Sequence, residues 1–385
     1  MNNRQLYPLL AVIEKKIEDS PFAGIPLHGQ GSEAPCITFR DYMAMCLYDD
    51  DFGYYRSGPA RVGKEGDFYT SGAVGDVMAS VLARYLSARH DGMGPACLLE
   101  WGAGTGRLSA GIRAAGLRLD REWDAKYWTA MAEDHPAHAA AALESFARAG
   151  LPGRPEVWSS DEAWRRLSRG LGGPAAVLAN ELLDAFPVHR VVCRGGELLE
   201  IGVGSGREGL YETAMPLTDA AVAESLRRDG IRLAEGQMTE VNLEAERWIG
   251  RLSAVPGSLA VILLDYGHDA DEYAAEHRME GTLLTYRNHT AGFRPLERPG
   301  VQDLTAHVNF SSIRRAAREA GFRIDYDGTQ LQFLLDFGAL ELLSDHRETD
   351  PFGPASRRNR AVRQLLLSDG MSETFKVMAL SKSEG

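Results

Sequence analysis

A short glycine-rich turn restricts the fold of this chain more than any other feature. The apolar run Cys97–Trp101 reads as a buried strand, contains the acid Glu100 near its end and leads directly into Gly102–Gly106. A helix with apolar periodicity, carrying Leu108 and Ile112, follows. Glycine is needed at such a turn because a Cβ atom would forbid the backbone conformation or collide with a ligand. The turn therefore predicts a cofactor site at the carboxyl end of a strand.

The acid in this strand helps to choose the cofactor. A dinucleotide would place its pyrophosphate at the N-terminus of the following helix, where the Glu100 carboxylate would repel it. A cofactor with an amine and a sulfonium suits the carboxylate better. We therefore predict S-adenosylmethionine. The alternatives are a nucleotide such as NAD, whose fingerprint has a different third-glycine spacing, and a tight turn without a ligand.

Short apolar segments alternate with helical segments after this turn, which is the pattern of a doubly wound parallel sheet. Glu133 follows the strand Tyr127–Ala132, where this fold places a carboxylate for ribose hydroxyl groups. Asn180 and Glu181 follow the strand Ala176–Ala179 at the same open edge. Alternatively, Glu133 is a surface acid or a helix cap, and Asn180 or Glu181 caps a helix that follows.

The chain divides into a core with two additions. The core comprises residues 76–187 and 257–385, and residues 1–75 form a helical and loop segment in front of it. Residues 188–256 read as an inserted subdomain with both helices and strands. A second glycine-rich run in this insertion, Gly202–Gly209, lacks a following apolar helix and predicts a hairpin.

Two smaller features bear on the site. The stretch Gly66–Ser71, with Asp67 and Thr70, follows neither a helical nor a strand period and predicts a functional loop, either a lid or a cofactor clamp. His135 and His138 stand at helical spacing without further metal-ligand residues nearby, so we expect them to be exposed. No metal site is predicted.

Charge and composition exclude several other classes. The net charge of -12 argues against nucleic acid or an anionic membrane as the main partner. The four cysteines contain no Cys-x-x-Cys pair, and no apolar stretch approaches the ~20 residues that a membrane span needs. Residues 1–19 lack the features of a leader peptide. We therefore expect a protein of the cytoplasm.

Several segments together resemble the MidA family of methyltransferases, which includes the mitochondrial complex I assembly-factor methyltransferase. The two most specific matches are Asn180–Ala185, within a matching run that ends at Pro187, and Gln302–Val308. Further matches are Ile37–Phe39 with Tyr42 and Met43, Tyr48–Tyr55, Gly66–Thr70, Glu100–Gly106, Asp265–Gly267, Gly281–Leu283 and Pro299–Phe310. The sequence departs from the family at Trp101, where Phe is usual, and at Tyr69–Ser71.

This resemblance implies an α/β fold: a Rossmann-like class I methyltransferase sheet with an N-terminal helical segment and an inserted α+β subdomain. It also implies S-adenosylmethionine as cofactor and an arginine on a protein, such as a complex I subunit, as acceptor. The predicted site residues are Asn180 and Glu181 for catalysis and, for the cofactor, Glu100, Gly102, Ala103, Gly104, Gly106, Glu133, Asp67 and Thr70. An assembly factor that holds a partner protein and a small-molecule methyltransferase remain alternatives. We expect a homodimer.

Overall fold

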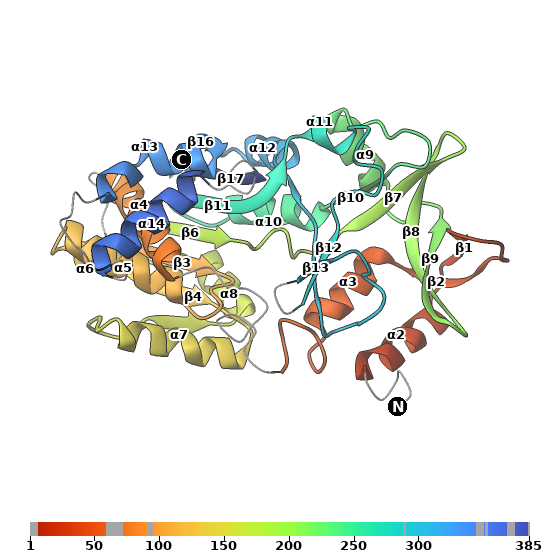
Figure 1. Cartoon of the computed structure of the whole chain (residues 1–385), viewed down its shortest axis with the longest axis horizontal. Helices are drawn as coiled ribbons and strands as arrows, with labels where there is room; N and C mark the ends of the chain where they lie inside the picture. Colours follow the sequence, from red (N-terminus) through yellow and green to blue (C-terminus); the bar gives the residue numbers. More distant parts are fainter. Residues whose placement is uncertain are drawn as a thin grey trace. The chain divides into compact units, whose positions relative to one another are not determined.

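The computed structural model describes residues 7–58, 72–90, 95–287, 290–343, 350, 353–367 and 374–383. The chain forms two compact units (Figure 1). The first comprises Met1–Pro59, Leu183–Gly250 and Gly267–Ala316, and the second comprises Ala60–Leu182, Arg251–Tyr266 and Ala317–Gly385. By this division, residues 267–316 group with the N-terminal segment and the predicted insertion, and not with the core.

The second unit is built on a sheet with the strand order β16-β17-β11-β6-β3-β4-β5. Its strands are β3 (Ala96–Trp101), β4 (Tyr127–Ala132), β5 (Glu156–Trp158), β6 (Ala175–Asn180), β11 (Leu259–His268), β16 (Arg323–Thr329) and β17 (Phe375–Lys382). Strands β5, β4, β3, β6 and β11 run parallel, whereas β17 is antiparallel to both of its neighbours. This arrangement confirms the α/β fold class predicted from the sequence.

Helices cover both faces of this sheet because side chains alternate between the faces along each strand. Leu98 of β3 packs into a core that also contains residues from five α-helices and a 3-10 helix of this unit. Trp101 points to the other face, where its ring centroid lies 4.6 Å from that of Trp164. The helices of this unit are α4 (Gly72–Arg89), α5 (Arg107–Leu119), α6 (Trp123–Lys126), α7 (Pro136–Arg148), α8 (Ser160–Arg169), α13 (Gln330–Asp336), η1 (Ala339–Leu342) and α14 (Pro354–Leu367).

The first unit has a six-stranded sheet with the order β10-β7-β8-β2-β1-β9, in which β9 also pairs with β8. Its strands are β1 (Ala23–Pro26), β2 (Ala34–Thr38), β7 (His189–Arg194), β8 (Glu197–Gly206), β9 (Gly209–Met215) and β10 (Met238–Val241). The hairpin predicted at Gly202–Gly209 joins β8 to β9. Gly202 lies within β8. Glycine is needed at this position because a Cβ atom would come within 2.8 Å of the Ile37 carbonyl oxygen.

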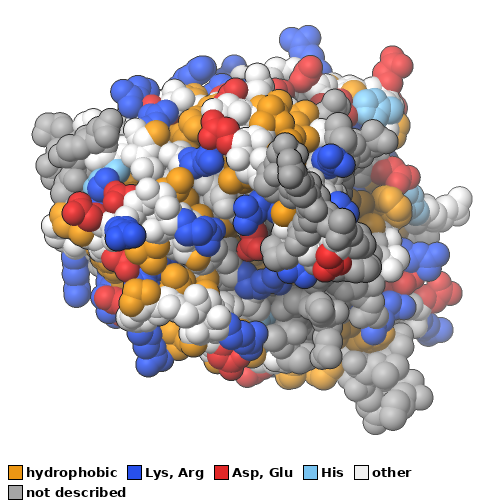
Figure 2. All heavy atoms as spheres, turned by 60° about the vertical axis from the view of Figure 1, so that its left-hand side comes forward, with side chains coloured by type: hydrophobic (Ala, Val, Ile, Leu, Met, Phe, Trp, Pro, Cys, Tyr) orange, Lys and Arg blue, Asp and Glu red, His pale blue; other side chains and the backbone are white. Residues whose placement is uncertain are grey.

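Short strands and helices complete the first unit. A three-stranded sheet contains β12 (Leu284–Arg287), β13 (Thr290–Gly292) and β14 (Asp303–Thr305), and β15 (Val308–Asn309) pairs with the end of β11. The helices are α2 (Pro8–Glu18), α3 (Phe39–Tyr48), α9 (Ala220–Asp229), α10 (Leu243–Ser253), α11 (Ala270–Tyr273) and α12 (Phe310–Glu319). Among the described residues, none of the helices combines the length and the apolar composition that a membrane span requires. Basic, acidic and apolar side chains are intermixed on the face that Figure 2 shows.

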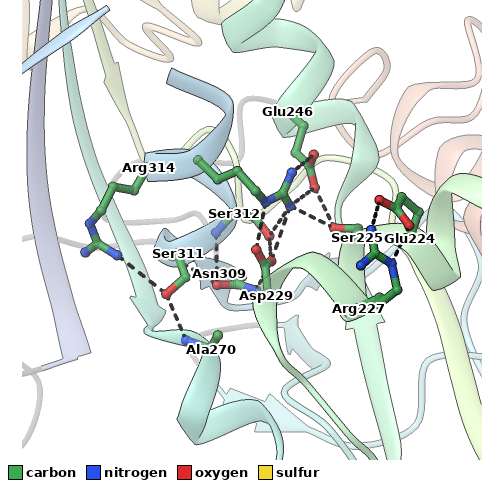
Figure 3. A network of polar contacts seen from close by, with 11 residues as sticks. Glu224, Ser225, Arg227, Asp229, Glu246, Ala270, Asn309, Ser311, Ser312 and Arg314 are labelled. Carbon is green, nitrogen blue, oxygen red and sulfur yellow. Dashed lines mark hydrogen bonds and ion pairs between the residues drawn. The ribbon is translucent and has the colours of Figure 1, made fainter. Parts of the chain in front are cut away.

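An ion network joins three helices of the first unit. The Arg315 guanidinium in α12 donates from Nε to Asp229 of α9 at 2.8 Å and from Nη1 to Glu246 of α10 at 3.1 Å. Figure 3 shows these two carboxylates turned toward each other, with Ser225 and Ser312 beside them. The side chain of Asp229 is only 3% exposed, so it accepts its hydrogen bonds from Arg315, Ser312 and Asn309 rather than mainly from water.

Replacing Arg315 by alanine is expected to lower the free energy of unfolding by about 3 kcal/mol, because two largely buried carboxylates would lose their cation. Arg227→Ala is the control, since its pair with Glu224 is exposed and such pairs contribute little to stability. Urea unfolding of both variants measures the difference. Equal losses in the two variants would mean that the network does not stabilise the unit.

Candidate functional site

The polar residues predicted from the sequence lie at the ends of neighbouring parallel strands in the second unit. Glu100 belongs to β3 and pairs in register with Leu178 of β6, and Glu133 follows β4 directly. Asn180 ends β6 and Glu181 follows it. Because parallel strands end at one edge of a sheet, the structure brings these four side chains to the same edge.

The turn after β3 requires glycine for two reasons. Gly102, Gly104 and Gly106 have φ angles of 70°, 52° and 65°, a left-handed conformation that residues with a Cβ atom rarely adopt. A Cβ atom on Gly106 would also lie 2.8 Å from Cβ of Ala142. Ala103 is held by its N–H group, which donates to the Ala132 carbonyl oxygen at 3.2 Å. The glycines thus permit both the path of the turn and its close packing against α7.

Glu100 points toward the helix that follows the turn. Its Oε2 accepts from the Ser109 N–H group at 3.1 Å and from the Ser109 hydroxyl at 2.5 Å. Burial raises the pKa of the Glu100 carboxyl to about 7, and the charge of Glu133 adds to this rise. No described residue donates a hydrogen bond to Oε1. Oε2 is thus the oxygen that Ser109 engages.

Glu133 binds the glycine-rich turn from the neighbouring strand. Its Oε2 accepts from the Gly104 N–H group at 2.7 Å, and its Oε1 accepts from the His135 N–H group at 2.8 Å. The Nδ1 atom of His138 lies 3.8 Å from the same Oε1. These contacts fix the carboxylate beside the turn, where the fold expects an acceptor for ribose hydroxyl groups.

The prediction that His135 and His138 are exposed is wrong. Their residues are only 2% and 3% exposed, and their ring centroids lie 4.4 Å apart. His135 is the N-cap of α7, because Pro136 begins that helix and the His135 Nδ1 accepts from the Ala137 N–H group at 3.2 Å. The Pro136 signal in the sequence was sufficient to find this cap.

Glu181 has an unusual backbone conformation. Its φ angle is 50°, and it is the one non-glycine residue with a positive φ among those that the structure describes. Such a conformation costs about 1–3 kcal/mol and is found preferentially at functional sites. Burial raises the pKa of the Glu181 carboxyl, while a hydrogen bond from the Asn180 side chain lowers it. Residues 181–188 contain no helix, so the alternative that Asn180 or Glu181 caps one is wrong.

Two predicted site residues cannot be placed. Asp67 and Thr70 lie outside the described residues, as does the stretch proposed as a lid. Conversely, Ser109, Leu182 and Asp265 were given no role in the sequence analysis, although all three contact the site. In the sequence, Asp265 stood out only as part of the family segment Asp265–Gly267.

Within the described ranges, no three His, Cys, Asp or Glu side chains gather in a way that could hold a metal ion.

The geometry fits an amine-bearing cofactor with ribose hydroxyl groups. Three glycines with positive φ angles form the turn, and two carboxylates, of Glu100 and Glu133, flank it. A pyrophosphate would meet these negative charges instead of a cation. These two acceptor carboxylates therefore suit S-adenosylmethionine better than a dinucleotide.

Known proteins resemble this chain over most of its length. A family model described as "Putative S-adenosyl-L-methionine-dependent methyltransferase" matches residues 81–327. The protein arginine methyltransferase NDUFAF7 homolog of Drosophila melanogaster is 27% identical over 308 residues, covering 74% of this chain and 67% of that protein. NDUFAF7 of Mus musculus is 26% identical over 309 residues, covering 73% and 66%. The chain thus aligns with about two thirds of these relatives' length.

Two solved structures are also similar to this chain. A protein from Burkholderia thailandensis with S-adenosyl-homocysteine bound is 30% identical and has a TM-score of 0.83. That match covers 98% of this chain and 92% of the solved one. A second structure from the same organism has a TM-score of 0.81 at 29% identity.

The expectation of a cytoplasmic location is contradicted by these comparisons. The curated relatives from the fly, the mouse and Danio rerio are all named mitochondrial. That expectation depended on the cysteine pattern, the lack of a long apolar stretch and the composition of residues 1–19. This is weaker evidence than relatives that match three quarters of the chain.

Proposed function

Since the chain belongs to the family of S-adenosylmethionine-dependent methyltransferases that matches residues 81–327, we propose that it methylates arginine side chains of a protein. The MidA-family resemblance and the cofactor predicted from the sequence are confirmed by the same comparisons. The observation that carries the proposal is Glu181, a carboxylate held at φ 50° beside the cofactor turn. The names of the relatives, protein arginine methyltransferase, support it.

The residues around the turn would hold the cofactor. The carboxylate of Glu133 would accept from the ribose hydroxyl groups, and Oε1 of Glu100 would accept from the amine. Gly102, Gly104 and Gly106 would let the backbone approach closely. When bound, S-adenosylmethionine supplies a methyl group on a cationic sulfonium, so the protein must align the acceptor and remove one proton.

Glu181 and Asn180 would act on the acceptor. A carboxylate binds a guanidinium through two parallel hydrogen bonds, which would orient one nitrogen toward the methyl group. The raised pKa of the Glu181 carboxyl also favours acceptance of the proton that this nitrogen loses. Asn180 hydrogen-bonds the same carboxylate and would keep it oriented. The family resemblance extends the proposal to a subunit of respiratory complex I as the protein substrate.

Glu181→Gln is expected to lower arginine methylation at least about 100-fold, because the amide can neither bind the guanidinium bidentately nor accept its proton. Binding of S-adenosylmethionine should change less than about threefold, since the cofactor contacts are elsewhere. Mass spectrometry of proteins methylated by the purified enzyme in lysate, and calorimetry for the cofactor, measure the two effects. Full methylation of a verified arginine by Glu181→Gln would contradict the role.

Glu144→Gln is the matched control, because this glutamate of α7 is 61% exposed and pairs only with the neighbouring Arg148 among described residues. It should leave both measurements unchanged.

If substitution of neither Glu181 nor Asn180 lowers methylation while the cofactor still binds, the chain would instead be a factor that holds a partner protein. Methylation found only on small molecules would show that the chain is a small-molecule methyltransferase. The homodimer remains a prediction, which light scattering of the purified chain would test.

A further inference from the structure

The left-handed conformation of Glu181 must be held by its surroundings, since an isolated glutamate would avoid it. One contact comes from the neighbouring strand: the Glu181 N–H group donates to the Leu264 carbonyl oxygen at 2.9 Å. This bond continues the parallel pairing of β6 with β11, in which Asn180 is opposite Leu264. It fixes the residue on its N-terminal side only.

Asp265 supplies the contact on the other side. Its Oδ2 accepts from the N–H group of Leu182, the residue after Glu181, at 3.2 Å. Its Oδ1 accepts from the Tyr266 N–H group at 2.9 Å, which orients the carboxylate. The residue is 1% exposed, so both bonds lie away from water. Glu181 is thus held between two consecutive residues of β11.

The same turn also contacts the cofactor loop. The Cδ1 atom of Leu182 would lie 3.0 Å from a Cβ atom built on Gly102, so the leucine side chain packs directly over this glycine. A shift of the Leu182 backbone would therefore move both the acceptor carboxylate and the side chain that covers the start of the glycine-rich turn.

From these contacts we propose that Asp265 is a positioning residue of the methyl transfer. It holds the Leu182 N–H group and thereby keeps the Glu181 carboxylate in the left-handed conformation that faces the acceptor. This inference depends on the proposed role of Glu181, although its main test does not require a known acceptor.

The test is a double-mutant cycle between positions 181 and 265, read from the midpoint of thermal unfolding. Glycine adopts positive φ without strain, so the Glu181→Gly variant no longer needs Asp265 to hold the turn. Asp265→Ala should lower the midpoint at least twice as much with Glu181 present as in the Glu181→Gly background. Equal shifts in the two backgrounds would overturn the proposal. Should Asp265→Ala fail to fold, the same cycle is run with Asp265→Val, whose side chain also has no acceptor for the Leu182 N–H group.

Asp303→Ala is the matched control, because Asp303 is also fully buried and accepts from the next N–H group at 2.9 Å. It lies in the first unit, and its shift should be the same in both backgrounds. A non-additivity as large as that of Asp265 would overturn the proposal.

A second readout uses methylation of lysate proteins by the full chain. Asparagine keeps one oxygen that can accept from Leu182, so Asp265→Asn should retain several-fold more activity than Asp265→Ala, with cofactor affinity changing far less than activity. Equal activity of these variants and the parent would overturn the positioning role. A non-additive cycle combined with an active Glu181→Gln would leave Asp265 as the holder of the turn but refute the proposed role of Glu181.

Discussion

The Gly104→Val variant is expected to lose S-adenosylmethionine binding, with a dissociation constant raised at least about 100-fold, while the chain stays folded. Gly104 has a φ angle of 52°, which a β-branched residue adopts only with strain. Its N–H group donates to Glu133 at 2.7 Å, so a rotated peptide would also release the carboxylate proposed for the ribose. Two groups of the site would therefore be displaced by a single substitution.

Calorimetric titration with S-adenosylmethionine, and separately with NAD, measures this effect. Gly206→Val is the control from the other glycine-rich run, where a Cβ atom would meet only ordinary contact with Tyr211 at 3.4 Å. It should bind the cofactor like the parent, and NAD should bind to neither. Unchanged binding by Gly104→Val would show that the turn after β3 does not hold the cofactor.

The sheet of the second unit was predictable because its central strands are short apolar runs that end in polar residues. Strands β3, β4 and β6 were predicted within one residue of their bounds. The sequence predicts no strand before Cys97, however, and β1 and β2 were missed. These strands contain Gly and Pro and are only partly buried, and β2 pairs with β8, as in Cys36 with Gly204. A local pattern carries no information about a partner so far along the chain.

The site was predictable as a set of residue types, but its internal contacts were not. The acids Glu100 and Glu133 were found from their places after apolar strands. That one oxygen of Glu100 is occupied by Ser109 depends on the alternation of side chains along β3, which turns Glu100 toward α5. The strained conformation of Glu181 depends on β11, which lies about 80 residues away in the chain, so no local signal could reveal it.

Glu100 is expected to make both folding and cofactor binding depend on pH. Its pKa is about 7 in the folded chain against an ordinary value of 4.5, so the folded state binds this proton more tightly than the unfolded state. Its contribution to stability is therefore present below pH 4.5 and is lost as the pH rises to about 7. The shift corresponds to about 3 kcal/mol. Glu100→Gln should remove this loss and be more stable than the parent at pH 8.

Cofactor binding should respond in the opposite direction, because the ionised carboxylate is the form that attracts an amine. The affinity for S-adenosylmethionine should rise roughly tenfold from pH 6 to the plateau above the pKa of Glu100. Titrations between pH 5.5 and 7.5 avoid the deprotonation of a free α-amino group near pH 8. Glu100→Gln should bind weakly at every pH in this range. Glu156→Gln, in β5 and bonded to Trp158 and Arg166, should keep the parent profile. If the parent and Glu100→Gln give the same flat profile, Glu100 does not contact the cofactor, and the buried charge would serve only to hold Ser109 at the start of α5.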